Sequence, residues 1–327
     1  MQKFSQPKGV SLAVSVFLAD DTYDYIPNTY SATGLIKPLK QTILAKRVPP
    51  NLDIPTVTNV FKARMGNALH DGVENAWKLR YKKNLQSLGY PQDIIDRIVI
   101  NPTKVSKRDI PVYMEQRMKR VIDGHTVTGK YDFIGDGVLE DFKSTSTYVW
   151  GKESKDIEYQ LQGSIYRWLD ANNIITSDYI QISFMFTDWS AGKAFKNENY
   201  PQEPTPIKHV PLLSLTDTEE FITSKIVLLT KYNDTPEEGL PPCNDRDLWR
   251  NDPEYKYYSN PEKLTRATKN FKSDAAGAYA HLNLKGVGIV KEIVGKPTAC
   301  IYCKAFPICK QKDTYIMDGT LNPEERR

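Results

Sequence analysis

Several residues that could bind a metal ion or move a proton are crowded into one short segment, GKYDFIGDGVLEDFKSTSTYVW at 129–150. Its Asp136-Gly137 pair predicts a two-residue β-hairpin turn, because a type I′ turn needs positive φ at both central positions. With that turn, Asp132 falls opposite Asp141 on the neighbouring strand. Cross-strand partners project from one face with Cβ atoms roughly 4.5–5.5 Å apart, so we expect two facing carboxylates.

Facing carboxylates repel each other unless a cation lies between them. Mg²⁺ typically takes one or two carboxylates together with water and substrate phosphate, so a divalent metal is the expected cation. Alternation along the strand puts Lys143 on the same face and turns Glu140 away from it. The lysine could orient an attacking water or hold a phosphate oxygen. The alternative is an ordinary exposed hairpin with solvated charges.

Two further pairs of polar residues stand at helical spacing. His70 and Glu74 are four positions apart in a run, 58–81, whose apolar residues recur with the period of a helix. Gln162 and Tyr166 share one face of a second predicted helix, within SKDIEYQLQGSIYRWLDANN. Each pair alone is weak evidence, because a lone helical histidine is more often a packing or surface residue than a ligand.

The elements around these residues predict an α/β core. A second Asp-Gly turn at 123–124 predicts an antiparallel meander, and SDYIQISFMFTDW reads as a buried central strand. We expect strands at 113–122, 125–134 and 138–145, a helix at 214–235, and an irregular region at 236–312 that carries all the cysteines.

The order of these motifs resembles the PD-(D/E)xK nuclease superfamily. A helix with G-x3-H-x3-E precedes a strand Asp, then Asp-x-Lys, then a helix with Q-x3-Y, over roughly residues 56–190. The RecB-like branch, which includes CRISPR-adaptation and phage exonucleases, is the nearest in pattern. The resemblance implies a restriction-endonuclease-like core, in which a mixed central sheet with an antiparallel meander is flanked by helices.

The resemblance also implies an activity and a role for each matching residue. The activity is Mg²⁺- or Mn²⁺-dependent hydrolysis of DNA phosphodiester bonds by an exonuclease. Lys143 would position and help to activate the water, and Gln162 and Tyr166 would steady the nucleic acid or the lysine. The implied metal ligands are His70, Asp132, Asp141 and the backbone carbonyl of Phe142, with Glu74 as a further candidate.

The four cysteines of the chain all lie in its last third, as Cys243, Cys300, Cys303 and Cys309. Four clustered cysteines outside a secretory context indicate a Cys₄ metal site more often than buried thiols, although unligated thiols are the alternative. The C-x2-C-x5-C tail is similar to that of iron–sulfur-bearing RecB-like nucleases, which implies a [4Fe–4S] cluster, with Zn²⁺ as the alternative. In those relatives the first cysteine usually precedes the nuclease core, whereas Cys243 follows it.

Charge is distributed unevenly along the 327 residues. The net charge is +4, but the segment 261–312 holds ten Lys/Arg against three Asp/Glu. A basic segment joined to an acidic metal site fits a polyanionic substrate, and we expect Lys269 and Lys272 to contact DNA that has a free end or a single-stranded region. A solvated basic face is the other interpretation.

The sequence thus predicts three parts: an N-terminal helical or irregular region packed on the core (1–55), the nuclease core (56–235) and a basic C-terminal segment with the Cys₄ site (236–327). We expect a DNA nuclease acting in recombination, repair or processing. No apolar run approaches the ~20 residues of a membrane span, and no targeting signal is evident, so a cytoplasmic protein is expected, in the host cell if a phage encodes it. The alternative function is a non-catalytic iron–sulfur or zinc DNA-binding protein with a vestigial nuclease site.

Overall fold

The computed structural model describes residues 4–5, 8–21, 26–52, 54–151 and 153–326 of the chain. The chain divides into two compact units. One comprises residues Met1–Ile36 and Ile54–Thr230, and the other comprises Lys37–Asp53 and Lys231–Arg327. The segment 37–53, which the sequence analysis grouped with the N-terminal region, therefore clusters with the C-terminal part of the chain.

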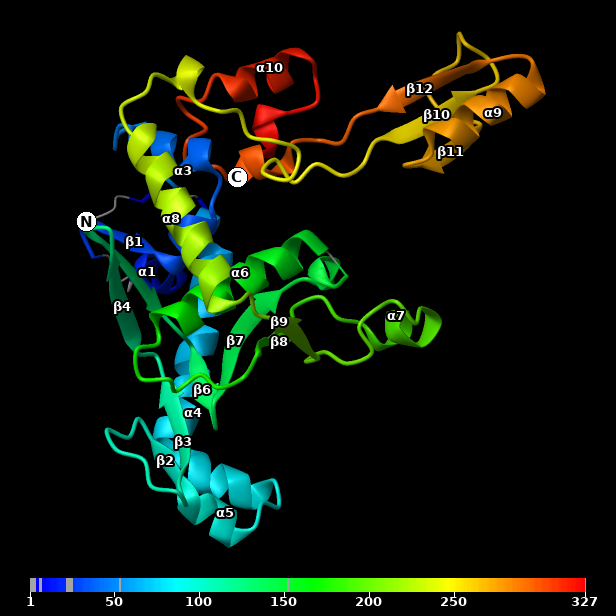
Figure 1. The fold of residues 1–327 in the computed structure, drawn as a ribbon. Helices are drawn as coiled ribbons and strands as arrows, with labels where there is room; N and C mark the ends of the chain where they lie inside the picture. Colours follow the sequence, from blue (N-terminus) through cyan, green and yellow to red (C-terminus); the bar gives the residue numbers. More distant parts are fainter. Residues whose placement is uncertain (1–3, 6–7, 22–25, 53, 152, 327) are drawn as a thin grey trace. The chain divides into compact units, whose positions relative to one another are not determined.

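The first unit contains two β-sheets (Figure 1). The larger sheet has the order β2-β3-β6-β7-β8-β9, in which β2–β3 and β7–β8 are parallel and the other neighbours are antiparallel. The smaller sheet has the order β1-β5-β4, with β1 parallel to β5. The expected mixed α/β class, with mixed sheets flanked by helices, is confirmed. The strands are β1 (Thr29–Ser31), β2 (Ile98–Ile100), β3 (Ile110–Met114), β4 (Arg117–Ile122), β5 (His125–Lys130), β6 (Phe133–Gly135), β7 (Val138–Thr145), β8 (Tyr179–Phe186) and β9 (Ile207–Pro211).

Between β3 and β6 the chain crosses between these two sheets twice. The sequence predicted continuous strands at 113–122 and 125–134, and both predictions are wrong, because each run is divided into one strand of each sheet. Glu115 has a φ of 53°, a left-handed conformation that ends β3. Its backbone N–H donates to the carbonyl of Asp132 over 3.1 Å, so the two crossing points lie side by side.

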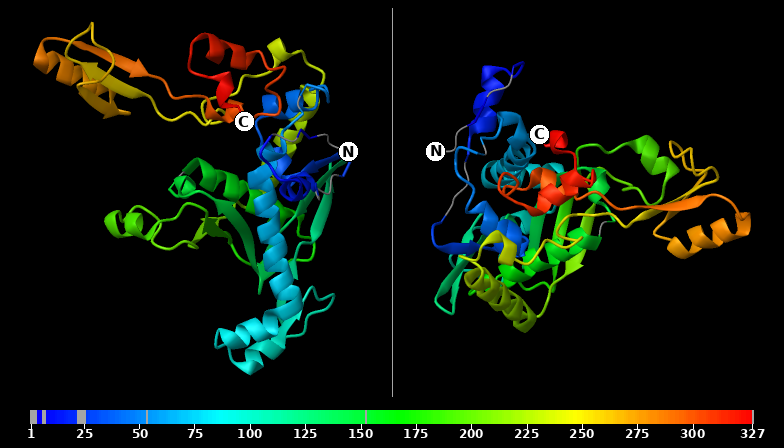
Figure 2. Two further views of the ribbon diagram at one scale, coloured as in Figure 1. Left: turned by 180° about the vertical axis from the view of Figure 1, so that it is seen from behind. Right: turned by 90° about the horizontal axis from the view of Figure 1, so that it is seen from above.

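Helices α4 and α6 cover opposite faces of the six-stranded sheet. On one face, Val73 and Trp77 of α4 pack against a core cluster that includes Phe142 of β7. On the other face, Gln162 of α6 contacts Asp141, the preceding residue of β7. Because successive strand residues point to opposite faces, the sheet lies between the two helices; α6 is in front in Figure 1 and α4 in front in the left view of Figure 2. The helices of this unit are α1 (Leu12–Ala19), α2 (Ala32–Ile36), α4 (Phe61–Ser87), α5 (Gln92–Arg97), α6 (Glu153–Leu169), α7 (Ala191–Lys196) and α8 (Leu215–Lys231).

A glycine brings α6 close to the sheet. A Cβ placed on Gly163 would lie 2.8 Å from the Cβ of Ile180 and 2.7 Å from Cδ2 of Leu212. Real side chains do not approach so closely, so only glycine lets the helix lie against β8 at this distance. Ile165, Trp168 and Leu169 are buried as the helical periodicity predicted, whereas Ile157, also predicted to face inward, is 39% exposed.

The second unit contains a small module of three strands and one helix. Strands β10 (Glu254–Tyr258), β11 (Lys269–Lys272) and β12 (Ile289–Ile293) form an antiparallel sheet in the order β11-β10-β12. Helix α9 (Ala275–Lys285) begins at Asp274, whose side chain accepts from Gly277 N–H over 2.8 Å, and ends before Gly286 at φ 66°. The unit also contains α3 (Leu39–Ala45) and α10 (Gln311–Met317).

The expectation of an irregular region at 236–312 is therefore wrong. Tyr257, Tyr258 and Ala278 are buried, which gives this module a small core of its own. Apolar periodicity is weak in β10 (EYKYY) and β11 (KNFK), where aromatic residues stand among charged and polar ones. In the described part of the chain, none of the helices combines the length and apolar character needed to cross a membrane.

Candidate functional site

The hairpin predicted at Asp136-Gly137 is confirmed. These two residues have φ values of 48° and 83°, as a type I′ turn requires. The flanking residues pair in the predicted register, with Ile134 opposite Leu139. Just beyond the last β6–β7 pair, the Asp132 carboxylate accepts a hydrogen bond of 2.9 Å from the backbone N–H of Phe142. The hairpin thus holds Asp132 beside the segment that carries Asp141.

Asp141 is a buried carboxylate, 2% exposed, held from two directions. The Lys143 ammonium lies 2.5 Å from its Oδ2, and Gln162 donates a 2.7 Å hydrogen bond to its Oδ1. Burial raises the pKa of Asp141, the Asp132 charge raises it further, and Lys143 acts in the opposite direction. Burial lowers the pKa of Lys143, but the Asp141 charge outweighs this and leaves it raised. Lys143 is therefore protonated and serves as a fixed positive charge.

Gln162 and Tyr166 of α6 form a buried support behind Asp141. The Gln162 amide lies 3.2 Å from the Tyr166 hydroxyl, which in turn donates to the Lys130 carbonyl over 3.0 Å. Burial raises the pKa of Tyr166 well above its usual range, so the hydroxyl stays neutral. These residues are placed to orient Asp141 and to join α6 to β5, rather than to exchange protons.

His70 of α4 lies where the hairpin ligands converge. Its Nε2 is 3.2 Å from the Phe142 carbonyl, and its Nδ1 is 3.4 Å from the nearer Asp132 oxygen. Although burial lowers the pKa of His70, its contacts with Asp132 and Glu115 raise it to about 10. In the metal-free protein a protonated imidazole thus neutralises the acidic residues around it.

Glu115 is the member of this cluster that the sequence analysis missed. Its Oε1 lies 3.8 Å from His70 Nδ1, and its Oε2 lies 2.5 Å from the Lys130 ammonium. Burial would raise the pKa of Glu115, but the contacts with His70 and Lys130 lower it, so the carboxylate is ionised. The left-handed conformation at the end of β3 turns this side chain toward Asp132. An acid inside the β-forming run VYMEQRMKR was the one signal in the sequence.

These groups suit a divalent cation with nitrogen and oxygen ligands. In the described residues, ligand atoms of His70, Glu115 and Asp132 all lie within 4.8 Å of one another. Adjacent ligands of an octahedral Mg²⁺ are roughly 3 Å apart, given bonds of about 2.1 Å, and the His70 distances are close to this. Asp141 Oδ2 also lacks an aligned hydrogen-bond donor despite its short contact with Lys143. The donor set therefore fits such an ion.

Glu74, the further candidate ligand, is engaged elsewhere. Its carboxylate forms an ion pair of 2.5 Å with Lys78 one turn along α4. Neither Glu74 nor Asp141 belongs to the group formed by His70, Glu115 and Asp132, but Asp141 adjoins it as the neighbour of Phe142 on β7. The structure thus brings Glu115, rather than Glu74, to the acidic cluster.

The four cysteines are free, half-buried thiols of the second unit. Burial, the charge of Asp247 and the charges of the other three thiols together raise the pKa of Cys243 to about 12. Gln311 of α10 holds the backbone of Cys243 by two hydrogen bonds of 2.9 Å, one to its N–H and one to its carbonyl. Cys243 is therefore brought near the other three despite its distance along the chain.

The spacing of the thiols bears on the kind of metal. In a tetrahedral zinc site the sulfurs are roughly 3.8 Å apart, since Zn–S bonds are about 2.3 Å. Within the described residues, no three cysteine sulfurs lie within 4.8 Å of one another. Among the described cysteines the structure therefore shows no preformed tetrahedral zinc site.

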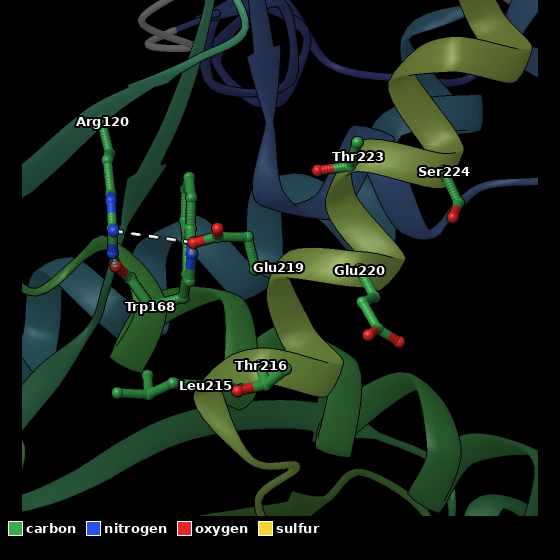
Figure 3. A pocket seen from close by; sticks show the side chains of 8 residues that line it. All are labelled: Arg120, Trp168, Leu215, Thr216, Glu219, Glu220, Thr223 and Ser224. Carbon is green, nitrogen blue, oxygen red and sulfur yellow. Dashed lines mark hydrogen bonds and ion pairs between the residues drawn. The ribbon is translucent and has the colours of Figure 1, made fainter.

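An open pocket on the first unit is separate from these groups (Figure 3). Arg120 stacks on Trp168, with Cζ 4.4 Å from the ring centroid, and lies 3.6 Å from Glu219. Trp168 also donates to Glu219 over 2.8 Å. Arg120 and Glu219 thus compensate each other's charge at this pocket.

Comparison with known proteins yields little. No family model matches the chain, and no curated protein does. One solved structure, described as that of SSO0001, is similar over 66% of this chain and 84% of its own, with a TM-score of 0.39 and 15% identity. The site geometry is therefore the basis of the functional argument.

Proposed function

We propose that the protein is a Mg²⁺- or Mn²⁺-dependent deoxyribonuclease of the PD-(D/E)xK type. The observation that carries the proposal is the buried Asp141, held between Lys143 and Gln162 and adjoining a His70–Asp132–Glu115 cluster that fits a divalent ion. An ordinary exposed acidic hairpin would not bury a carboxylate beside a lysine and other acidic residues. Burying charged groups costs free energy unless each charge is compensated.

Each residue has a defined part in this proposal. The ion would be held by His70, Asp132, Asp141, Glu115 and the carbonyl oxygen of Phe142. It would supply positive charge next to the negatively charged phosphodiester and lower the pKa of a bound water molecule. The positively charged ammonium group of Lys143 would lie next to an attacking water or a phosphate oxygen. Gln162 fixes the orientation of Asp141 and is itself fixed by Tyr166.

In the second unit, we propose that Cys243, Cys300, Cys303 and Cys309 hold one [4Fe–4S] cluster. The support is the C-x2-C-x5-C spacing of Cys300, Cys303 and Cys309 and the two hydrogen bonds from Gln311 that bring Cys243 to α10. The cluster would connect the two ends of the β10–β12 module, since Cys243 precedes this module and the other three cysteines follow it. Its role would be structural.

The decisive experiment incubates anaerobically purified protein with end-labelled single- and double-stranded DNA and Mg²⁺ or Mn²⁺. We expect cleavage that EDTA abolishes and that Asp141→Asn reduces by at least a thousandfold. Glu140→Gln is the matched control, because Glu140 lies on the other face of β7 and accepts a hydrogen bond from Ser183. Unchanged cleavage by Asp141→Asn would exclude this site as the nuclease centre. Comparing linear with covalently closed circular duplex shows whether a free end is needed.

A further inference from the structure

The module formed by β10, β11, β12 and α9 has one covered and one open sheet face. The His281 ring of α9 lies 4.9 Å from the ring of Tyr257 and 5.6 Å from that of Phe271, measured between centroids. Helix α9 therefore covers the face to which these two aromatic residues point. Lys256, next to Tyr257 in β10, must project from the opposite face.

The open face carries a group of lysines. Residues directly opposite in an antiparallel pair project from the same face. Lys256 is opposite Lys291 of β12, and Glu254, two positions earlier, is opposite Lys272 of β11. The face opposite α9 thus carries three lysines and one glutamate, together with Ile289, Ile293 and, at one end, the buried Tyr258.

This arrangement leaves positive charge uncompensated. Lys256 and Lys291 are like charges in directly opposed positions, which destabilises a sheet unless an anion lies between them. Glu254 lies 3.9 Å from Lys256, which is a loose contact. Lys272 and Lys291 are exposed, and among the described residues neither forms a close ion pair, although Glu254 is opposite Lys272 in the sheet.

We propose that this face, formed by Lys256, Lys272 and Lys291, binds the phosphate backbone of DNA. The proposal deepens the proposed function, on which it rests for the identity of the polyanion. The exposed Asn270, opposite Lys256, adds an uncharged hydrogen-bonding group on the same face. Three lysines on one face can neutralise phosphates of a nucleic-acid backbone.

The covered face determines what kind of binding this is. Phe271 and Tyr257 point into α9, so their rings cannot stack on bases. Lys269 lies on that face too, with its ammonium 4.8 Å from the Phe271 centroid. Lys269 and Lys272, predicted together as DNA contacts, thus belong to opposite faces, and only Lys272 belongs to the binding face. Binding through phosphate contacts alone is independent of sequence and weakens steeply with salt.

The test compares two double variants of the full-length protein that remove equal charge from opposite faces. Lys256→Gln/Lys291→Gln alters the open face, and Lys269→Gln/Lys285→Gln alters the α9 side. Binding to fluorescein-labelled duplex and single-stranded oligonucleotides is followed by anisotropy in EDTA over a range of salt. For the open-face variant with duplex DNA, we expect at least a tenfold loss of affinity. The slope of the logarithm of the binding constant against the logarithm of the salt concentration should become shallower by about 2, because each lost phosphate contact reduces this slope by about 0.9. The opposite-face variant should retain most of its affinity.

Equal losses in both double variants, or a loss in neither, would overturn the proposal. So would competition by polyglutamate as strong as that by unlabelled DNA of equal charge, because the face would then recognise acidic protein. Thermal melting of both variants establishes that they are folded. Binding in EDTA does not depend on cleavage, so a protein that loses DNA binding in the open-face variant but never cleaves DNA would refute the nuclease proposal alone.

Discussion

Gln162 of α6 donates a 2.7 Å hydrogen bond to the carboxylate of Asp141 on β7, and Lys143 contacts the other oxygen of that carboxylate. The two contacts come from different elements, one from a helix and one from the same strand. A buried carboxylate held in this way keeps one orientation, which a metal ligand requires.

Replacing Gln162 with Ala should therefore destabilise the protein and slow cleavage. The change removes a donor to a buried ionised group, for which a loss of about 1–3 kcal/mol of unfolding free energy is expected. Urea denaturation measures the stability, and single-turnover cleavage measures the rate. Gln160→Ala is the control: Gln160 is on the same helix, but its amide donates to the exposed Pro211 carbonyl of β9, so its loss should cost little. If both substitutions had equal effects on stability and cleavage rate, Gln162 would have no special role in orienting Asp141.

Glu115→Gln should weaken metal binding. The amide has the size of the carboxylate but lacks its charge, and loss of such a group typically lowers metal affinity by about 10–100-fold. The measurement is the rise in melting temperature with Mn²⁺ concentration, alongside the Mn²⁺ dependence of cleavage. Glu74→Gln, which alters an acid paired with Lys78, should leave the Mn²⁺ titration unchanged. If Glu74→Gln weakened Mn²⁺ binding more than Glu115→Gln did, Glu74 rather than Glu115 would be the metal ligand.

Two glycines of the first unit should respond in opposite ways to the same substitution. Gly163→Ala forces a methyl group into Ile180 and Leu212 and should cost about 1–3 kcal/mol. Gly72→Ala, in α4, meets no atom within 4 Å and should stabilise the helix by about 0.5–1 kcal/mol. Chemical denaturation of both variants checks this. A stabilising Gly163→Ala would show that α6 does not pack as closely on β8 as described.

Replacing Cys303 with Ser should remove the cluster and leave the hydrolytic chemistry largely intact. Wild-type protein prepared anaerobically should be brown and contain iron and sulfide, whereas the variant should lose both, along with solubility and DNA affinity. Metal analysis and absorbance measure the first effect, and anisotropy measures the second. Colourless wild-type protein with one zinc would replace the iron–sulfur assignment but retain the four-cysteine site.

The hairpin could be predicted from sequence because its turn is specified locally. Asp136 and Gly137 accept positive φ, and this fixes the register that holds Asp132 beside Phe142. The approach of His70 could be anticipated only through the order of motifs, because the packing of α4 on the sheet is a tertiary contact.

Glu115 could not be predicted, because its place depends on a strand break at a residue without a turn signal. The run VYMEQRMKR has the composition of a continuous strand, yet φ at Glu115 is 53°. The C-terminal module was missed for a related reason. In EYKYY and KNFK the covered face is aromatic and the open face is largely charged, so the pattern lacks the aliphatic residues that usually mark a strand.

The two crossings between the sheets also govern when the acidic cluster can form. Glu115 and Asp132 meet at these crossings, next to the β3–β6 pair, but His70 reaches them only when α4 packs on β7, where it contacts Phe142 across 72 residues of chain. Pairings between segments so distant in the chain tend to form late, because loop closure costs entropy before the contacts compensate for it. A folding intermediate with only local helices and hairpins would lack the assembled ligands. Metal affinity should thus arise at the last cooperative step of folding, and a half-folded chain would be harmless to DNA.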